Sequence, residues 1–456
     1  MKVNNKNEKL KHEKNNTIEY EGFFRSITSI QAITIIGIII WHIGDLSKIR
    51  EHSNIFIRTF FEIIESSGDV FIFLSGILLT IGVMRTNYER YSWKRWYGRR
   101  IVRIYPILII STFFYLFSNY YLFHTVFDAN SVLVHMSGLQ STPTTLEATF
   151  FLIAPPHWYV TLILSCYLLF PLLFLCIKKN AKLTAFLGTL LFVCYLLFAN
   201  AIFEVSKEVI SLIFQKELFL WQYSLFILRY FVFLFGMLLG YWIGRNPTKN
   251  IGILQNKTVG LIAFVFLIII ILFYFIFPIT NYTLLDFIRI LYHPLISISF
   301  VFFSIWFFQS KTIINKTLEV PGNETLELFL IHQFVIDIFY YRIIEYFSLQ
   351  NRIELYLIFI PLIVIISIAL ALPFFLLGRI FRNERKTHKA IFTLSFSLII
   401  YALIISIFNL NSVISDLNSL LLFSSIIIIL SLINIFIFFT KKKKLKFNLH
   451  MNKLFL

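Results

Sequence analysis

A histidine and an aspartate stand at the adjoining ends of two neighbouring apolar segments. His42 ends the first long apolar segment of the chain, and Asp69 opens the second. If the first segment crosses a membrane outward and the second returns, we expect the two side chains at similar depth near the outer face. A carboxylate beside an imidazole fixes its tautomer and stabilises the cation formed when it takes a proton. The pair predicts a general base; the alternative is an interfacial histidine that only hydrogen-bonds lipid headgroups.

Three arginines gather at the start of the third apolar segment, on the expected cytoplasmic side. Arg99, Arg100 and Arg103 precede Pro106. In a helix, this spacing places at least two guanidinium groups on one face, which suits several phosphate groups. The alternative is ordinary anchoring of a membrane helix by positive charge on its cytoplasmic side.

Further ionisable residues interrupt later apolar segments. His332 lies about two turns into its segment from the expected cytoplasmic side, which is too deep for the side chain to reach water easily. Arg229, Arg289 and His293 fall in the outer halves of theirs. Because charge inside a bilayer is costly and usually marks a functional pathway, these positions suggest an inner site for a phosphorylated donor and an outer His/Asp site. Such an arrangement indicates chemistry across a membrane.

The outer segment 124–157 has a different composition from the apolar segments around it. It is expected to act either as a lid over an outer cavity or as a simple connector. It contains His124, Asp128, His135, Glu147 and the run Pro155, Pro156, His157 that leads into Trp158.

The composition explains why these charges matter. The chain has 456 residues, of which 58% are hydrophobic and 14% charged, against roughly 25% charged in an ordinary soluble domain. A soluble enzyme, a disulfide scaffold and a disordered linker are excluded. Lys and Arg outnumber Asp and Glu by 41 to 24, a net charge of +17, but they lie in short gaps between apolar segments, which indicates membrane topology and not a nucleic-acid partner. Cys166, Cys176 and Cys194 are read as apolar side chains, with no disulfide or metal-ligand spacing.

Apolar segments of about 20 residues, long enough to cross a hydrocarbon core, recur along the whole chain. The second needs part of 55–68 to reach that length. We expect an all-α membrane helix bundle of about 12 spans. The segments are 23–43, 69–84, 101–123, 158–177, 183–203, 225–244, 258–279, 286–308, 326–347, 354–378, 390–408 and 417–440.

Charge in the connecting loops tests this count. Every second loop is rich in Lys and Arg, from the N-terminal tail to Lys441–Lys444, while the intervening loops are acidic, mixed or neutral. Cytoplasmic loops carry such an excess of positive charge. Both termini are therefore predicted to face the cytoplasm.

The motifs, taken in order, resemble acyltransferase family 3, integral membrane proteins that include O-acyltransferases of bacterial surface polysaccharides. The resemblance runs from Ile30 to about Pro361. It rests on an apolar stretch closed by Trp-His (38–42), Asp-Val-Phe-Ile-Phe-Leu-Ser-Gly (69–76), Arg-Arg-Ile-Val-Arg-Ile-Tyr-Pro (99–106), Trp-Tyr (158–159) with the stretch 167–171, Arg229 with Phe-Leu-Phe-Gly-Met-Leu-Leu-Gly (233–240), and Thr-Leu-Glu-Leu-Phe-Leu-Ile-His (325–332).

The resemblance implies residue roles. His42 and Asp69 would be catalytic; Arg99, Arg100, Arg103 and His332 would bind acyl-CoA; Ser75, Trp158 and Arg229 would contact the acceptor or support the site. Acyl-CoA is then a co-substrate, and no bound cofactor or metal is expected. Two positions depart from the family pattern: Gln31 stands where an arginine is usual, eleven residues before the histidine, and Thr325–Leu326 stands where Ser-Tyr is usual.

The resemblance also implies an organisation and a location. Residues 1–22 are expected to be a cytoplasmic tail, 23–380 the acyltransferase-like domain, 381–440 two additional helices and 441–456 a basic cytoplasmic tail. The expected product is an O-acylated glycan, with a short acyl group such as acetyl moved to a hydroxyl of a surface or lipid-linked glycan at a bacterial cell membrane.

Two readings from other classes remain open. About a dozen helices with both ends inside is also a plan used by secondary transporters, although the chain shows neither an internal repeat nor matching broken helices in two halves. A glycan flippase or polymerase would share the acceptor but not the acyl-CoA site. Consumption of a thioester separates the acyltransferase from both.

Overall fold

The computed structural model describes residues 2–46, 55–86, 92–123, 125, 127, 129–139, 154–214, 226–276, 282–310, 312–340 and 353–382. These residues form α-helices and one 3-10 turn, with no strand among them, as the all-α prediction required. The elements are α1 (Lys2–Leu46), α3 (Ile55–Glu65), α4 (Ser67–Met84), α5 (Trp93–Phe123), α6 (Ala129–Ser137), η2 (Pro155–His157), α8 (Trp158–Phe214), α9 (Phe226–Arg245), α10 (Pro247–Leu254), α11 (Lys257–Ile276), α12 (Tyr282–Phe308), α13 (Thr312–Asn323), α14 (Thr325–Phe339) and α15 (Ile353–Arg382).

The chain divides into two compact units, Met1–Arg379 and Ile380–Leu456. All the helices except the end of α15 belong to the first unit. The predicted spans 390–408 and 417–440 and the basic tail lie outside the described residues.

Four helical stretches within the described residues are long and apolar enough to cross a membrane: Glu21–Leu46, Phe56–Met84, Trp158–Tyr195 and Leu291–Phe308. The helices α10 and α11 pass the same test together as a pair bent by 49°. The second stretch confirms that residues before Asp69 are needed to complete that span. The total of about 12 spans and the cytoplasmic termini stay predictions.

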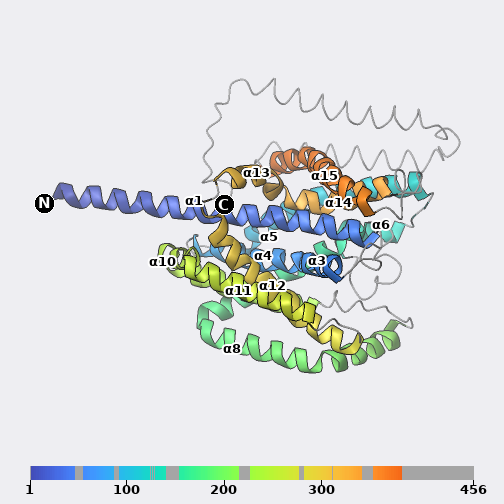
Figure 1. Cartoon of the computed structure of the whole chain (residues 1–456), viewed down its shortest axis with the longest axis horizontal. Helices are drawn as coiled ribbons and strands as arrows, with labels where there is room; N and C mark the ends of the chain where they lie inside the picture. The colour runs from blue at the N-terminus through green and yellow to red at the C-terminus, as the bar shows by residue number, and fades with distance from the viewer. Residues whose placement is uncertain are drawn as a thin grey trace, which may run out of the picture. The chain divides into compact units, whose positions relative to one another are not determined.

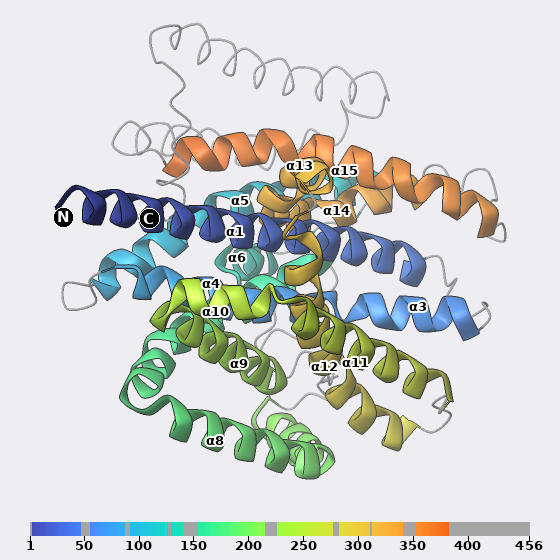
Figure 2. The ribbon, with the colours of Figure 1, turned by 60° about the vertical axis from the view of Figure 1, so that its left-hand side comes forward.

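The helix α8 contains the boundary between two predicted spans. Its backbone leaves the helical region at Asn180, where φ is −156° and ψ is 92°. The Asn180 side chain accepts a hydrogen bond from the Leu183 amide at 3.0 Å, so it caps the second part of the helix. Figure 2 shows α8 changing direction along its length. The break falls inside the lysine-containing loop 178–182 that the sequence predicted.

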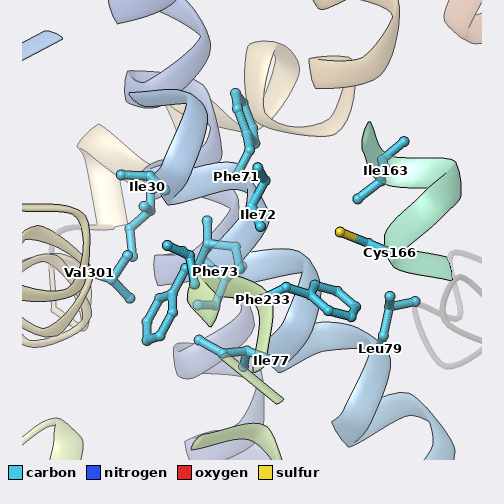
Figure 3. Close-up of a cluster of buried hydrophobic side chains, with 14 of the residues drawn as sticks. Ile30, Phe71, Ile72, Phe73, Ile77, Leu79, Ile163, Cys166, Phe233 and Val301 are labelled. Atoms are coloured by element: carbon cyan, nitrogen blue, oxygen red, sulfur yellow. The ribbon is translucent and has the colours of Figure 1, made fainter. Parts of the chain in front are cut away.

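The helix α4 is largely buried and packs along α9. Figure 3 shows Phe233 of α9 among α4 side chains such as Phe73 and Ile77, with Ile30 of α1 and Val301 of α12 in the same cluster. Burial of such side chains supplies the packing that holds membrane helices together. Figure 1 shows α1 running past α4, α13 and α14, and it is in contact with all three.

Glycines set the close approach of α4 and α9. A Cβ on Gly236 would collide with the Phe73 carbonyl oxygen, and one on Gly76 would collide with the Phe233 carbonyl and lie 2.8 Å from the Met237 amide nitrogen. Gly240 meets the Ile77 backbone in the same way. The Gly-x-x-x-Gly spacing of 236–240 is a pattern that lets two membrane helices bring their backbones together.

Replacing Gly236 with alanine is expected to lower the melting temperature of the purified protein, because the added methyl group forces α4 and α9 apart at a cost of about 1 to 3 kcal/mol. The matched control is Gly82→Ala, on the partner helix α4, where an added Cβ meets nothing within 4 Å. Thermal unfolding in detergent measures both. Equal melting temperatures for the two variants would contradict the role assigned to the glycine contact.

Candidate active site

His42 lies four residues before the end of α1, and its side chain is partly exposed. Its nearest aromatic neighbours are two rings: the Trp41 ring meets it edge to face at 4.8 Å between centroids, and the His332 ring lies 5.0 Å away with a tilt of 45°. Among the described residues, no hydrogen bond or ion pair engages the His42 imidazole. A histidine held in this way can accept a proton from a substrate that reaches it.

His332 lies on α14 and is fully buried. Its Nδ1 is 3.1 Å from the carbonyl oxygen of Leu328, one turn earlier. On its other side the ring packs at 5.7 Å from Phe329, which in turn lies 4.7 Å from the Tyr159 ring. The aromatic contacts therefore connect the two histidines to the start of α8.

Asp69, in the first turn of α4, is held by α9 and α12. Its Oδ1 is 3.2 Å from Nε of Arg229, and its Oδ2 is 3.9 Å from Nδ1 of His293. The Asp69 and Arg229 side chains are only 2% and 10% exposed. The structure thus gives this carboxylate a cationic partner, and among the described residues no contact joins it to His42.

The expected similar depth of His42 and Asp69 was wrong. A Cβ on Gly37 would lie 2.9 Å from Ser67 Oγ, and one on Gly44 would collide with the Phe61 ring, so α1 runs antiparallel to α3 and α4 with Gly37 level with Ser67. His42 is five residues beyond Gly37, and Asp69 two residues beyond Ser67 in the opposite direction. Seven residues at 1.5 Å each place Asp69 about 10 Å deeper than His42.

The other residues expected to support the site gather around Asp69. The Arg229 guanidinium lies over the Trp158 ring, 5.0 Å from its centroid, a cation–π contact. The neighbouring Tyr159 hydroxyl hydrogen-bonds Ser75. Ser75 and Trp158, both half-buried, therefore form one group with the buried pair Asp69 and Arg229. The sequence interpretation gave no role to Tyr159, although the Trp-Tyr motif contained it.

The arginine group lies at the N-terminal end of α5. Arg99 and Arg103 are exposed, whereas Arg100 is partly buried with its guanidinium 5.4 Å from the Trp96 ring centroid and 5.9 Å from that of Tyr167. Two of the three cations are thus available to a ligand, and the third is held against aromatic rings of α5 and α8.

The sequence had suggested that His332 lies with these arginines. In the structure it lies away from them. The Phe334 amide donates a hydrogen bond to the Tyr115 hydroxyl at 3.2 Å, so α14 meets α5 near Tyr115. Tyr115 is twelve residues after Arg103, and His332 is two residues from Phe334. At 1.5 Å for each residue, His332 is about 15 Å along the helix axis from Arg103. His332 is a neighbour of His42 and not of the phosphate-binding candidates.

The outer segment contributes a second buried polar group. His157 Nε2 and Ser111 Oγ are 3.0 Å apart, and Ser111 Oγ donates to the Leu108 carbonyl. His135 of α6 lies 5.9 Å from His157, ring to ring, and both histidines are fully buried. The described part of this segment therefore packs into the bundle. His124, Asp128 and Glu147 lie outside the described residues.

One group of side chains in the described part of the chain could hold a metal ion. Glu62 and Glu65 of α3 and His293 of α12 each offer a ligand atom, and these atoms lie within 4.8 Å of one another. The sequence interpretation had missed Glu62 and Glu65, because it considered 55–68 only as the residues that lengthen the second span. The hydrogen bond from Ser297 to the Ser66 carbonyl, 3.0 Å long, joins α12 to α3 and α4 at this point.

These observations define the class of protein: a membrane helix bundle with a histidine pair near one end of α1 and a cluster of arginines at one end of α5. The family model described as an acyltransferase domain, that of acyltransferase family 3, matches residues 24–374. The chain belongs to this family. No curated protein and no solved structure matches the chain.

The family match covers most of the chain and all the candidate site residues. The protein is therefore a membrane acyltransferase, an enzyme that transfers groups other than amino-acyl groups. The family resemblance drawn from the sequence motifs is confirmed.

Proposed function

We propose that the protein is an O-acyltransferase that moves a short acyl group, such as acetyl, from cytoplasmic acyl-CoA to a hydroxyl of a surface or lipid-linked glycan. The observation that supports it most is His42: a partly exposed histidine at the end of a membrane-spanning helix, next to a second, buried histidine. A base in this position can meet an acceptor that arrives from the outer side of a bacterial cell membrane.

The donor would enter at the N-terminal end of α5. Arg99 and Arg103 are exposed there and would bind the phosphates of acyl-CoA, since guanidinium groups match phosphate oxygens in charge and geometry. An extended pantetheine arm would then cover the distance of about 15 Å along the axis to the level of the histidines. This arrangement keeps the charged part of the donor outside the apolar core.

The reaction itself needs one proton acceptor. His42 takes the proton of the glycan hydroxyl as its oxygen attacks the carbonyl carbon of the thioester. The carbon–sulfur bond then breaks, and the CoA thiolate leaves and receives the proton. The products are the O-acyl glycan and free CoA. General-base catalysis of this kind typically contributes about 10² to 10⁴ in rate.

Thioester consumption by purified protein in nanodiscs tests the proposal. With acetyl-CoA and a glycan acceptor, we expect release of free CoA thiol at a rate that depends on both. If the protein neither binds nor consumes acyl-CoA, the donor proposal fails. The first substitution to test would then be Gln31→Arg, which restores the usual arginine at that position.

The exposed arginines give a separate prediction. The double variant Arg99→Ala/Arg103→Ala is expected to raise KM for acyl-CoA by about tenfold or more, equivalent to about 1.4 kcal/mol of lost binding, with little change in kcat. The reason is that both side chains meet the donor far from the reacting atoms. Arg95→Ala, another exposed arginine of α5, is the matched control. An unchanged KM in the double variant would place the donor phosphates elsewhere.

A further inference from the structure

The hydrogen bond from His332 to the helix backbone determines the tautomer of its imidazole. A carbonyl oxygen only accepts hydrogen bonds, so Nδ1, 3.1 Å from the Leu328 carbonyl, must carry the proton. In the neutral ring the lone pair is then on Nε2. His332 thus presents a hydrogen-bond acceptor, not a donor, on the side of the ring away from the Leu328 carbonyl.

This acceptor is buried next to His42. His332 is fully buried, and its Nε2 has no hydrogen-bond partner among the described residues. Leaving a buried polar atom without a partner is unfavourable, because the atom has lost its hydrogen bonds to water. The His42 ring is 5.0 Å away, centroid to centroid, and it carries an N–H in every protonation state open to it. Catalytic hydrogen bonds are often long before substrate binds, and a rotation of the partly exposed His42 side chain would close this one.

We infer that His332 is the positioning residue of the catalytic base: its Nε2 accepts the N–H of His42, so that the other nitrogen of His42 presents a lone pair to the acceptor hydroxyl. When His42 takes the hydroxyl proton, the positive charge is shared along this hydrogen bond. The inference rests on the proposed function, because it assigns a partner to the base of that reaction.

A neutral partner fits the surroundings better than a carboxylate would. The carboxylate that the sequence offered, Asp69, is paired with Arg229 and lies about 10 Å deeper. On α14 itself, the Asp337 carboxylate accepts a hydrogen bond from the Gln333 amide at 2.8 Å. An imidazole orients the base without placing a second buried anion beside it.

Two amide substitutions test the roles of the two His332 nitrogens separately. The Gln side chain places its terminal group near the position of Nε2, and the Asn side chain near that of Nδ1. His332→Gln can therefore still accept the N–H of His42, whereas His332→Asn can replace only the bond to the Leu328 carbonyl. If the role of His332 is purely structural, His332→Asn should be the more active variant. If His332 positions His42, His332→Gln should be the more active one.

The expected result is a loss of kcat by about 10- to 100-fold in His332→Asn and His332→Ala, a part of the rate that general-base catalysis supplies. His332→Gln should retain most of kcat, and KM for acyl-CoA should stay the same in all three variants. The acidic limb of the kcat–pH profile, which reports protonation of the base, should move in His332→Asn and not in His332→Gln. Gln333→Ala, the adjacent buried polar residue, is the matched control.

A second readout needs no acyl donor. Diethyl pyrocarbonate modifies neutral imidazole, and mass spectrometry follows its reaction at His42. We expect slower modification of His42 in His332→Asn than in wild type, and a rate near that of wild type in His332→Gln.

The outcomes separate the two proposals. Normal kcat in His332→Asn, or an unchanged modification rate of His42, overturns the positioning role. Failure of the proposed function shows differently, as no thioester consumption by the wild-type protein.

Discussion

Replacing His42 with alanine is expected to lower kcat for acyl transfer by about 10² to 10⁴, because the acceptor hydroxyl then has no base to take its proton. KM for acyl-CoA should change little, since the arginines that would bind the donor phosphates lie at the N-terminal end of α5, away from the histidines. Release of free CoA thiol by purified protein measures both constants.

Two properties of the His42→Ala protein serve as controls: its affinity for acyl-CoA and its thermal stability. His42 makes no hydrogen bond to other described residues, so its removal should leave the melting temperature near that of wild type. Full acyl transfer by a folded His42→Ala protein would remove the proposed mechanism. A simultaneous loss of acyl-CoA binding would instead move His42 into the donor site.

Removing one partner of the buried pair Asp69–Arg229 is the change with the largest expected effect on stability. In Arg229→Ala the Asp69 carboxylate, 2% exposed, loses the cation that lies 3.2 Å away. Breaking a buried ion pair in this way costs about 3 to 5 kcal/mol. Thermal or denaturant unfolding in detergent would detect it.

Two variants test the origin of that cost. The double variant Asp69→Asn/Arg229→Gln removes both charges and should recover part of the lost stability, because no uncompensated ion remains. Arg25→Ala breaks the pair Arg25–Glu21, which is 3.1 Å apart but about half exposed, and should cost at most about 1 kcal/mol. Equal losses for Arg25→Ala and Arg229→Ala would argue against burial as the cause.

The helices could be predicted because lipid leaves the backbone few alternatives. Each apolar segment must satisfy its own hydrogen bonds, so segment length and loop charge were sufficient to locate the span that contains His42 and the break at Asn180 in α8. The structure also links Ser75, Trp158 and Arg229 through Tyr159 and Asp69, while their support of the acceptor site stays a prediction.

The pairing of the ionisable residues could not be predicted in the same way. Asp69 was treated as the start of a span, whereas the span begins at Phe56 and Asp69 lies near its middle. Its depth depends on the α3 helix and on the contacts of Gly37 and Gly44, which are tertiary. His332 was assigned to the donor site because distance along its own helix does not reveal which neighbour it meets.

The glycine contact between α4 and α9 also limits how the enzyme can move. Carbonyl groups of one helix fill the positions where side chains of the other would begin, so sliding or rotating α4 against α9 would create immediate clashes. Asp69 and Ser75 on α4 and Arg229 on α9 must therefore travel as one rigid body during turnover. We expect any gating that admits donor or acceptor to occur between this body and the helices that carry the two histidines, α1 and α14.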